Sequence, residues 1–275
     1  MAIRVGVTGA LGRMGRGIVK KVIDAEDLEL VCAIEAEGRA EKGRDIGEIL
    51  GAGRAGVALS TSDELPEVLR QSKPEVLVDF TNHEAAVGTV RVACSLGIDL
   101  VIGTTGFTQE ELREIHSLIK DHGVAAVISP NMATGVNIFF KLARDAAALF
   151  GDEYDVEIIE AHHRFKKDAP SGTALRVGEL IAEALGRDLE KCAVYGRDKG
   201  VAGERPGKEI AFHSIRGGDI VGEHTVVFAG IGERLELTHR AGARDAFVDG
   251  AIRAARFLKG KEKGRVYSTW DVLGL

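Results

Sequence analysis

The stretch IRVGVTGALGRMG at residues 3–15 decides the fold of this chain. Its first six residues are mostly β-branched and apolar, so they predict a buried strand over residues 3–8. Glycines at positions 9, 12 and 15 follow, and a helical pattern begins among them at residue 13. A strand, a glycine-rich turn and a helix in this order bring free backbone N–H groups and the positive end of a helix dipole to one point. The stretch therefore predicts a site for the phosphates of a dinucleotide.

An acidic residue, Glu35, lies 20 residues after the last of these glycines, at the end of a second predicted strand over residues 28–36. A carboxylate at this place in a dinucleotide-binding unit bonds the ribose diol of the cofactor. The spacing GxxGxxG differs from the usual GxGxxG, so the interpretation depends on the strand, the helix and the acid together. Glu35 favours NADH because it repels a 2′-phosphate. Arg13, Arg16 and Arg39 are near enough in sequence to hold that phosphate instead, which leaves NADPH open.

The first half of the chain alternates short β-branched runs with longer helical patterns, which is typical of parallel βαβ units. Further strands are predicted over residues 75–80, 99–103 and 124–128, and helices over residues 13–25 and 84–96. Another helix begins after Thr108, which can form a capping box with Glu111. This rhythm predicts an α/β fold whose N-terminal part is a Rossmann-type doubly wound parallel sheet. The segment 35–63 is the most loop-like region, because it is rich in glycine and charge.

The pattern changes after residue 131, and with 275 residues we expect two domains. The second, residues 132–241, is predicted to be an α+β domain with a mixed, largely antiparallel open sheet. Its strand-like runs at 209–215, 220–229 and 234–239 are expected to form an antiparallel meander with glycine turns at 217–219 and 230–232. Residues 242–275, with a helix at 246–258, are expected to pack back on the first domain, residues 1–131. The remaining predicted elements of the second domain are a helix at 136–150, a strand at 154–161 and a helix after Pro170.

Composition excludes several classes of partner. With 36 Lys and Arg against 42 Asp and Glu, the net charge is −6, which gives no long-range attraction to nucleic acid or to anionic membranes. The three cysteines are odd in number and widely spaced, which argues against a disulfide framework. No run approaches the roughly 18 apolar residues of a membrane span, and the N-terminus is too glycine-broken for a signal peptide. We expect a cytoplasmic protein whose ligand is a small molecule.

Two polar turns follow the fourth and fifth predicted strands. The first contains Gly103, Thr104 and Thr105, and the second runs from Ser129 through Pro130 and Asn131 to Met132. The carboxyl ends of parallel strands meet at the edge of the sheet where ligands bind, so either turn can contact the nicotinamide half of a dinucleotide. The alternative is a plain turn, since these residue types are common in turns.

The sequence EAHHRFKKDAPSGTA at residues 160–174 joins a predicted strand to a predicted helix. Its Pro-Ser-Gly-Thr turn offers free N–H groups and a helix N-terminus, which suit a carboxylate-bearing substrate. Lys166 can pair with acid groups or deliver a proton, Gly172 allows close backbone approach, and Thr173 can donate its hydroxyl. A solvated basic loop is the plainer alternative. Adjacent histidines on an extended segment point to opposite faces, and the chain has no CxxC or HExxH spacing, so we expect no metal.

Together these motifs resemble the 4-hydroxy-tetrahydrodipicolinate reductase family, also called dihydrodipicolinate reductase. The resemblance rests on the glycine turn at 9–15, the turn at 103–106, the loop around Asn131, the run 160–174 and GDIVGEHT at 218–225. It spans nearly the whole chain, and the run at 160–174 is its most specific part. It implies reduction of hydroxy-tetrahydrodipicolinate to tetrahydrodipicolinate with NADH or NADPH, in the diaminopimelate route to lysine.

The resemblance also implies roles for individual residues. His162 matches the proton donor of the family and Lys166 its second, substrate-contacting donor, while His163, Gly172 and Thr173 match residues that hold the substrate's carboxylates. The first domain is then the dinucleotide-binding domain, and the second binds substrate and assembles a homotetramer, with a hinge that closes the two over substrate. The cofactor residues implied are Gly9, Ala10, Leu11, Gly12, Arg13, Met14, Glu35, Gly103, Thr104, Thr105, Ser129, Pro130, Asn131 and Met132.

One departure from the family concerns Ala36, because an arginine often follows the acid in members that use NADPH. Ala36 therefore argues against a strong preference for NADPH. Two other functions stay open from the sequence. One is a different two-domain NAD(P)-dependent dehydrogenase that acts on an amino-acid or sugar intermediate. The other is a dinucleotide-binding regulator without catalysis, against which the intact His162 and Lys166 speak.

Overall fold

The computed structural model describes residues 2–201 and 203–275. Contacts between Cα atoms divide the chain into two compact units. Unit 1 consists of Met1–Thr134 and Asp245–Leu275, and unit 2 of Gly135–Arg244. Both divisions fall three residues later in the chain than the sequence pattern predicts.

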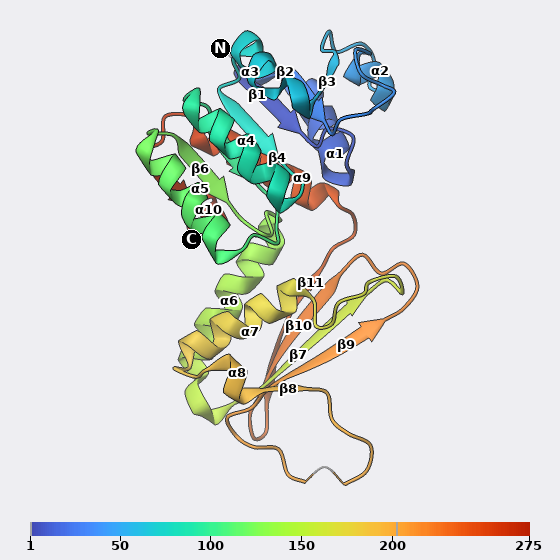
Figure 1. Ribbon diagram of the computed structural model, residues 1–275. Helices are drawn as coiled ribbons and strands as arrows, with labels where there is room; N and C mark the ends of the chain where they lie inside the picture. The colour runs from blue at the N-terminus through green and yellow to red at the C-terminus, as the bar shows by residue number, and fades with distance from the viewer. Residues whose placement is uncertain (1, 202) are drawn as a thin grey trace. The chain divides into compact units, whose positions relative to one another are not determined.

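Unit 1 is built on a seven-stranded sheet in the order β12-β6-β5-β4-β1-β2-β3 (Figure 1). All of its pairings are parallel. The chain winds outward from β1 in both directions, so the strand order reverses between β1 and β4 and leaves a ligand crevice at their carboxyl ends. This confirms the predicted doubly wound sheet. The strands are β1 Ile3–Thr8, β2 Leu28–Glu35, β3 Leu59–Thr61, β4 Val76–Asp79, β5 Asp99–Ile102, β6 Ala125–Ile128 and β12 Arg265–Tyr267.

Helices cover both faces of this sheet, which explains why its strands are apolar almost throughout. Side chains that alternate along a strand enter two cores. Val76 and Val78 join the core that contains α1 and α9, while Leu77 joins the core that contains α3, α4 and α5. The helices are α1 Arg13–Asp24, α2 Ile46–Leu50, α3 Leu65–Ser72, α4 His83–Ser95, α5 Gln109–Asp121, α9 Asp245–Leu258 and α10 Thr269–Leu273, with a 3-10 turn at Ser62–Glu64.

Local sequence signals explain the ends of several of these helices. The predicted capping box of α5 is confirmed: the amide of Glu111 donates to Thr108 Oγ1 at 3.2 Å, and the amide of Thr108 donates to the Glu111 carboxylate at 2.7 Å. The interpretation of residues 35–63 as a loop is wrong in part, because α2 and β3 lie within them. Asp45 makes α2 possible, since its carboxylate accepts from the amides of Glu48, Ala55 and Gly56 and so ties the segment together.

Unit 2 contains a five-stranded sheet in the order β11-β10-β7-β9-β8. β10 pairs antiparallel with β7 and β11, whereas β9 pairs parallel with β7 and β8. The sheet is therefore mixed and open, as predicted. The strands are β7 Asp155–His162, β8 Ala193–Tyr195, β9 Ile210–Arg216, β10 Glu223–Ala229 and β11 Arg234–Arg240; the helices are α6 Thr134–Phe150, α7 Gly172–Ala184 and α8 Leu189–Cys192, with a 3-10 turn at Gly151–Glu153.

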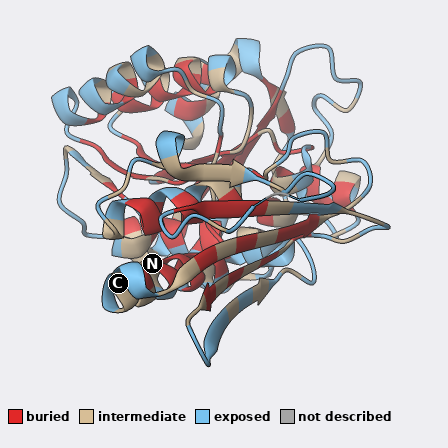
Figure 2. Cartoon of the chain, turned by 90° about the horizontal axis from the view of Figure 1, so that it is seen from below, coloured by how far each residue is buried: buried red, intermediate tan, exposed pale blue. Residues whose placement is uncertain are grey.

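The predicted antiparallel meander is wrong. β7 lies between β9 and β10, so residues 217–219 join two strands that do not pair with each other. The hairpin predicted at residues 230–232 is present between β10 and β11, with Gly232 at φ 95°. β7 pairs with a neighbour on each edge. Its residues alternate between buried and half-buried, so one face of the sheet is covered more than the other. The banding of strands in Figure 2 shows this alternation.

Candidate functional site

The glycine turn of unit 1 has the geometry of a phosphate site. α1 begins after Gly12 without a side-chain cap, so no protein hydroxyl or carboxylate caps its first turn. A Cβ atom at Gly15 would overlap the carbonyl oxygen of Gly9, and one at Gly9 would come within 2.9 Å of the Phe80 carbonyl oxygen. Gly9 also has φ 68°, a conformation that favours glycine. These contacts show why glycines stand at these positions, and the uncapped helix fits a dinucleotide phosphate.

Glu35 supports this turn as well as facing the crevice. Its carboxylate accepts from the amide of Leu11 at 2.8 Å and from the amide of Ala36 at 3.0 Å. A guanidinium nitrogen of Arg39 lies 3.4 Å from the same carboxylate. Arg16 is directed elsewhere, because its Nε donates to the carbonyl of Leu11 at 2.8 Å. Of the three arginines considered from the sequence, Arg39 is the one that the structure places against Glu35.

A cavity of about 730 Å³ opens at the crevice of the sheet. Its walls come from the ends of β1, β2 and β4, from the segment around Ser62 and from α4. Among the residues that line it are Thr8, Gly9, Gly12, Glu35, Ala36, Arg39, Asp63, Leu65, Pro66, Phe80, Thr81 and Asn82. The cavity combines an acid, a cation and apolar walls, which suits the adenosine part of a dinucleotide.

The two polar turns predicted to contact cofactor do not line this cavity. Gly103 packs on Phe80, since a Cβ there would overlap the phenyl ring. Thr104 is buried, whereas Thr105 is exposed. In the other turn, Ser129 Oγ donates to the carbonyl of Asn131 at 2.8 Å. Pro130 is exposed, and the side chain of Met132 is buried in the core of unit 1, so that residue has its backbone alone to offer a ligand.

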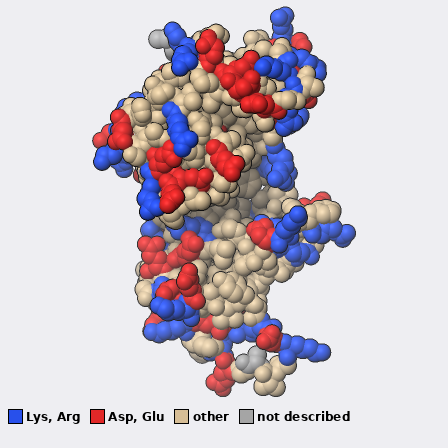
Figure 3. All heavy atoms as spheres, viewed as in Figure 1, with Lys and Arg blue, Asp and Glu red and all other residues tan. Residues whose placement is uncertain are grey.

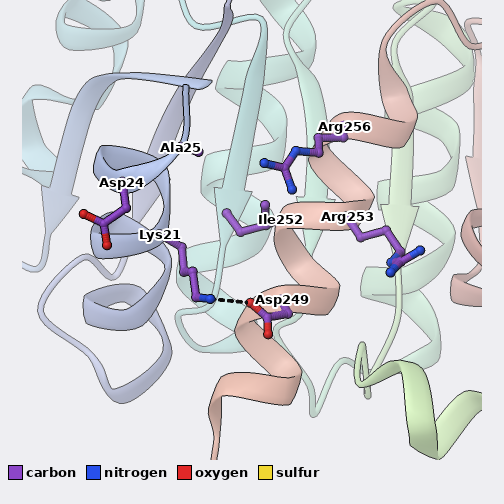
Figure 4. Close-up of a pocket in the computed structure, with 7 residues that line it drawn as sticks. All are labelled: Lys21, Asp24, Ala25, Asp249, Ile252, Arg253 and Arg256. Carbon is purple, nitrogen blue, oxygen red and sulfur yellow. Dashed lines mark ion pairs between the residues drawn. The ribbon is translucent and has the colours of Figure 1, made fainter. Parts of the chain in front are cut away.

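A second groove of unit 1 carries charge but no comparable site (Figure 4). It lies between α1 and α9 and has a volume of about 720 Å³. Lys21 pairs with Asp249 at 3.0 Å across it, and Arg256 pairs with Asp27 at 2.7 Å. These cations are neutralised by the protein itself. Figure 3 shows the same mixture of basic and acidic side chains over one face of the molecule, without a field of a single sign.

The run at residues 160–174 is organised in unit 2 around the buried carboxylate of Glu160. The side chain is 1% exposed, and it accepts from two guanidinium nitrogens of Arg216 at 2.7 and 2.8 Å. His162 Nδ1 lies 2.6 Å away, and the amide of Ser171 donates to it at 3.2 Å. Burial opposes the charge of Glu160, but the hydrogen bonds from Arg216 and His162 outweigh it and lower the pKa to about 2. Glu160 is therefore ionised at neutral pH.

His162 is held by this carboxylate. Because Glu160 is ionised, Nδ1–H of His162 donates to it, which leaves Nε2 for a ligand. A Cβ at Gly222 would lie 3.1 Å from Nε2, so the glycine keeps that side of the ring open. Burial lowers the pKa of His162, and the nearby cations Lys166 and Arg216 add to this effect, while Glu160 opposes it. The ring is therefore a weaker base than an ordinary histidine.

A second histidine, His224, contacts the turn that leads into α7. Ser171 Oγ accepts from the amide of Ala174 at 3.1 Å, and it lies 2.8 Å from His224 Nε2. Burial and the neighbouring His162 lower the pKa of His224 to about 3, so His224 is neutral and shares one hydrogen bond with the Ser171 hydroxyl through Nε2. Gly172 begins α7, and a Cβ there would meet nothing within 4 Å. The start of α7 therefore faces open space.

The other predicted substrate residues surround this centre. Lys166 Nζ pairs with both oxygens of Asp168, at 2.8 and 2.9 Å. The Asp168 carbonyl in turn accepts from Arg216 at 2.7 Å, which connects the lysine to the Glu160 cluster. His163 has a buried Nδ1 without a hydrogen-bond partner among the described residues. Thr173 is half-buried in the first turn of α7.

Sequence reasoning missed Glu160, Arg216, His224 and Asp79 as members of these sites. His224 faces Glu160 directly in the pairing of β10 with β7, and Arg216 faces His162 in that of β9 with β7. The motif GDIVGEHT at residues 218–225 contains His224, so the sequence drew attention to this histidine but did not show that it faces Glu160. Asp79 stands at the carboxyl end of an apolar strand, which is itself a signal for a functional acid.

Comparisons with known proteins agree with this geometry. The family model described as dihydrodipicolinate reductase, N-terminus, matches residues 3–132, and the one described as dihydrodipicolinate reductase, C-terminus, matches residues 135–273. The chain belongs to the dihydrodipicolinate reductase family. The resemblance inferred from the sequence motifs is thereby confirmed, and unit 1 is the NAD(P)-binding part of this reductase.

Individual members of the dihydrodipicolinate reductase family are similar over their full lengths. The 4-hydroxy-tetrahydrodipicolinate reductases of Methanothermobacter thermautotrophicus and Methanocaldococcus jannaschii are each 56% identical to this chain over 273 residues, covering 99% of it and 99% and 98% of their own chains. The structure of dipicolinate-bound dihydrodipicolinate reductase from Paenisporosarcina sp. TG-14 is 27% identical, with a TM-score of 0.78, and covers 98% of this chain and 99% of that one. An amine dehydrogenase from Mycobacterium smegmatis, at 15% identity and a TM-score of 0.61, shares the fold alone.

Two further observations concern the whole chain. Among residues 2–201 and 203–275, no helix is long and apolar enough to cross a membrane. Within the same residues, no three His, Cys, Asp or Glu side chains are grouped as a metal site requires.

Proposed function

We propose that this chain catalyses the NAD(P)H-dependent reduction of 4-hydroxy-tetrahydrodipicolinate to tetrahydrodipicolinate, in the diaminopimelate route to lysine. Unit 1 binds the dinucleotide, and unit 2 binds the dicarboxylate substrate. The observation that carries the proposal is the buried Glu160 carboxylate, which lies 2.6 Å from His162 Nδ1 and accepts from the Ser171 amide at the start of α7. The Glu160 carboxylate thus positions both the proposed proton donor, His162, and the helix N-terminus that is proposed to bind the substrate's carboxylates.

The reaction needs a hydride, a proton and places for two carboxylates. Substrate and product differ by replacement of a hydroxyl with hydrogen, so one hydride and one proton enter and one water leaves. When bound, the reduced nicotinamide supplies the hydride. Loss of the 4-hydroxyl with a neighbouring hydrogen, as water, turns the imine of the substrate into a conjugated imine. Hydride addition to this conjugated imine leaves an enamine-like anion, which takes a proton from the protein. A charged, preorganised site for that anion lowers the barrier further.

His162 is the proton donor in this proposal. Its Nδ1–H is engaged with Glu160, so the transferred proton is the one on Nε2 of the imidazolium. The ionised Glu160 stabilises that imidazolium and opposes the effect of burial on its pKa. The two negative charges of a bound dicarboxylate add to the effect of Glu160, so substrate itself helps to protonate the ring.

The carboxylates of the substrate are assigned to the start of α7 and its neighbours. The backbone of Gly172 and Thr173 lies at a helix N-terminus, where amides and dipole favour an anion. Lys166 provides the cation, which Asp168 holds in place. His163 provides a ring whose buried Nδ1 has no partner among the described residues. The dipicolinate in the Paenisporosarcina structure is a planar diacid of this chemical class.

The reductase activity is tested by the loss of nicotinamide absorbance in a mixture of the protein with NADH or NADPH. The substrate is generated freshly from pyruvate and aspartate semialdehyde. We expect oxidation that depends on the substrate and is inhibited by pyridine-2,6-dicarboxylate. A protein that binds nucleotide but oxidises neither cofactor would favour a different dehydrogenase or a non-catalytic regulator.

Arg39→Gln is expected to lower kcat/KM with NADPH about tenfold or more, as loss of a charge-assisted phosphate contact does. Arg39 lies against Glu35 with nearly half of its side chain exposed, so it can turn to a 2′-phosphate. With NADH, kcat/KM should change little, since Glu35 keeps its amide partners. Arg113→Gln, at an exposed position of α5 outside the cavity, is the control for a general loss of positive charge. Equal losses with both nucleotides would remove Arg39 from cofactor selection.

The homotetramer and the cytoplasmic location stay predictions. One face of the unit 2 sheet carries the apolar side chains of Ile159, Ile215 and Val227, and Ile215 is 51% exposed. The same face also carries Glu157, His213 and Thr225, and a face of mixed apolar and polar side chains suits association with further copies of the chain. The three cysteines are free thiols, as a reducing compartment requires.

A further inference from the structure

Asp79 is a fully buried acid that the reductase chemistry does not use. It is the last residue of β4, it is 0% exposed, and the three residues before it are apolar. Its carboxylate accepts from Thr8 Oγ1 at 2.6 Å, from Thr104 Oγ1 at 2.6 Å and from Thr81 Oγ1 at 3.0 Å. These three hydroxyls belong to the segments at the ends of β1, β5 and β4.

A carboxylate is a costly way to fill such a place. Burial disfavours its charge and raises the pKa of Asp79, and the hydroxyls of Thr104, Thr8 and Thr81 oppose that rise. An apolar residue like its strand neighbours would fill the same volume without this cost. The carboxylate therefore needs an explanation beyond packing.

The threonines that Asp79 holds belong to the wall of the nucleotide cavity and to the turn beside it. Thr8 and Thr81 line the cavity, and Thr8 directly precedes the glycine turn. The amide of Thr81 donates to Thr104 Oγ1 at 2.9 Å, so the hydroxyl that serves Asp79 also fixes the neighbouring segment. Two glycines let these segments approach, since Gly9 packs on the Phe80 carbonyl and Gly103 on the Phe80 ring.

We propose that Asp79 is a positioning residue for the dinucleotide: its carboxylate ties together the chain segments that follow β1, β4 and β5 and so preorganises the nucleotide cavity. The inference rests on the proposed function in one respect, that the ligand of unit 1 is NADH or NADPH. Asp79 acts through Thr8, Thr81 and Thr104. Its loss should therefore weaken nucleotide binding more than it weakens the fold.

The test compares Asp79→Asn with Asp99→Asn. Asp99 is the matched control, because it is buried in the same sheet at 6% exposure but begins β5 and so lies at the opposite edge. It accepts from the Ala125 amide at 2.9 Å and from Lys263 Nζ at 2.6 Å. For each variant, the Kd for NADH is measured by nicotinamide fluorescence without substrate, and the melting temperature is measured alongside.

We expect Asp79→Asn to raise the Kd for NADH at least tenfold, and the KM for NADH to rise with it more than kcat falls. Asp99→Asn should lower the melting temperature and leave the Kd within twofold of the parent. A Kd within twofold of the parent for Asp79→Asn would overturn the proposal and leave Asp79 a structural acid. Binding is measured without turnover, so a failed reductase assay does not affect this outcome.

A second pair of variants decides the matter if Asp79→Asn does not fold. Thr8→Val keeps the shape of the side chain and removes its hydroxyl from Asp79, whereas Thr8→Ser keeps the hydroxyl. The proposal expects Thr8→Ser to bind NADH more tightly than Thr8→Val by threefold or more. Equal affinities would overturn it.

Discussion

Replacement of His162 by glutamine should lower kcat by about a hundredfold to ten-thousandfold, the range that general acid catalysis contributes. Glutamine can still donate to Glu160 through its amide, so the local structure survives, but it has no proton to transfer. The Kd for NADH should not change, because His162 lies in unit 2 and the nucleotide turn in unit 1. Steady-state turnover and a nucleotide titration on the same preparation check both parts. Unchanged turnover would remove His162 from the reaction.

The role of His162 as an acid also predicts the direction in which activity changes with pH. An acid works while it is protonated, and burial holds the pKa of His162 below its ordinary 6.5 in the free protein. kcat/KM, which reports the free enzyme, should therefore fall as pH rises through that lowered pKa. kcat reports the complex, where the substrate's negative charges raise the pKa, so its fall should come at higher pH. In Glu160→Gln both falls should move to lower pH, since the carboxylate that supports the imidazolium is gone. An unmoved profile would contradict the role of Glu160.

Much of unit 1 could be predicted because its signals are local. β1, the uncapped glycine turn and the capping box at Thr108 each lie within a few residues of sequence, and the structure has them where the pattern placed them. The short elements α2 and β3 were missed, because five and three residues are too few to show a period. The meander failed for another reason. β7 lies between β9 and β10, which follow one another in the sequence, so the strand order of unit 2 cannot be obtained from adjacency along the chain.

The residues of the candidate site likewise fall into those that local sequence reveals and those that only the fold brings together. His162, Lys166 and Gly172 could be grouped from the sequence because one run of 15 residues, 160–174, contains them. Arg216 lies 56 residues from Glu160, and Thr8 lies 71 residues from Asp79, so their pairing depends on sheet register. Glu160 and Asp79 were therefore visible in the sequence as acids near the ends of strands, but their hydrogen-bond partners were not.

Arg216→Met should destabilise the protein by about 3–5 kcal/mol, the usual cost of leaving a buried charge without its partner. Glu160 is 1% exposed and Arg216 21%, and the guanidinium makes two of the hydrogen bonds that keep the carboxylate ionised. Methionine keeps much of the side-chain volume, so the loss reports charge and hydrogen bonding. The free energy of unfolding is measured by urea denaturation at neutral pH. Arg216→Lys, which keeps the charge but not the fork geometry, should lose less.

The double variant Arg216→Met with Glu160→Gln identifies the cause of that loss. If an unpaired buried carboxylate is what destabilises Arg216→Met, removing its charge should recover part of the stability, so that the double variant is more stable than Arg216→Met alone. Turnover should not recover with stability, because His162 then has no carboxylate to support its imidazolium. Additive losses of stability would mean that Arg216 acts through its contact with the Asp168 carbonyl instead. If stability recovers while turnover does not, the Arg216 charge serves to keep Glu160 paired, and the Glu160 charge serves to make His162 an acid.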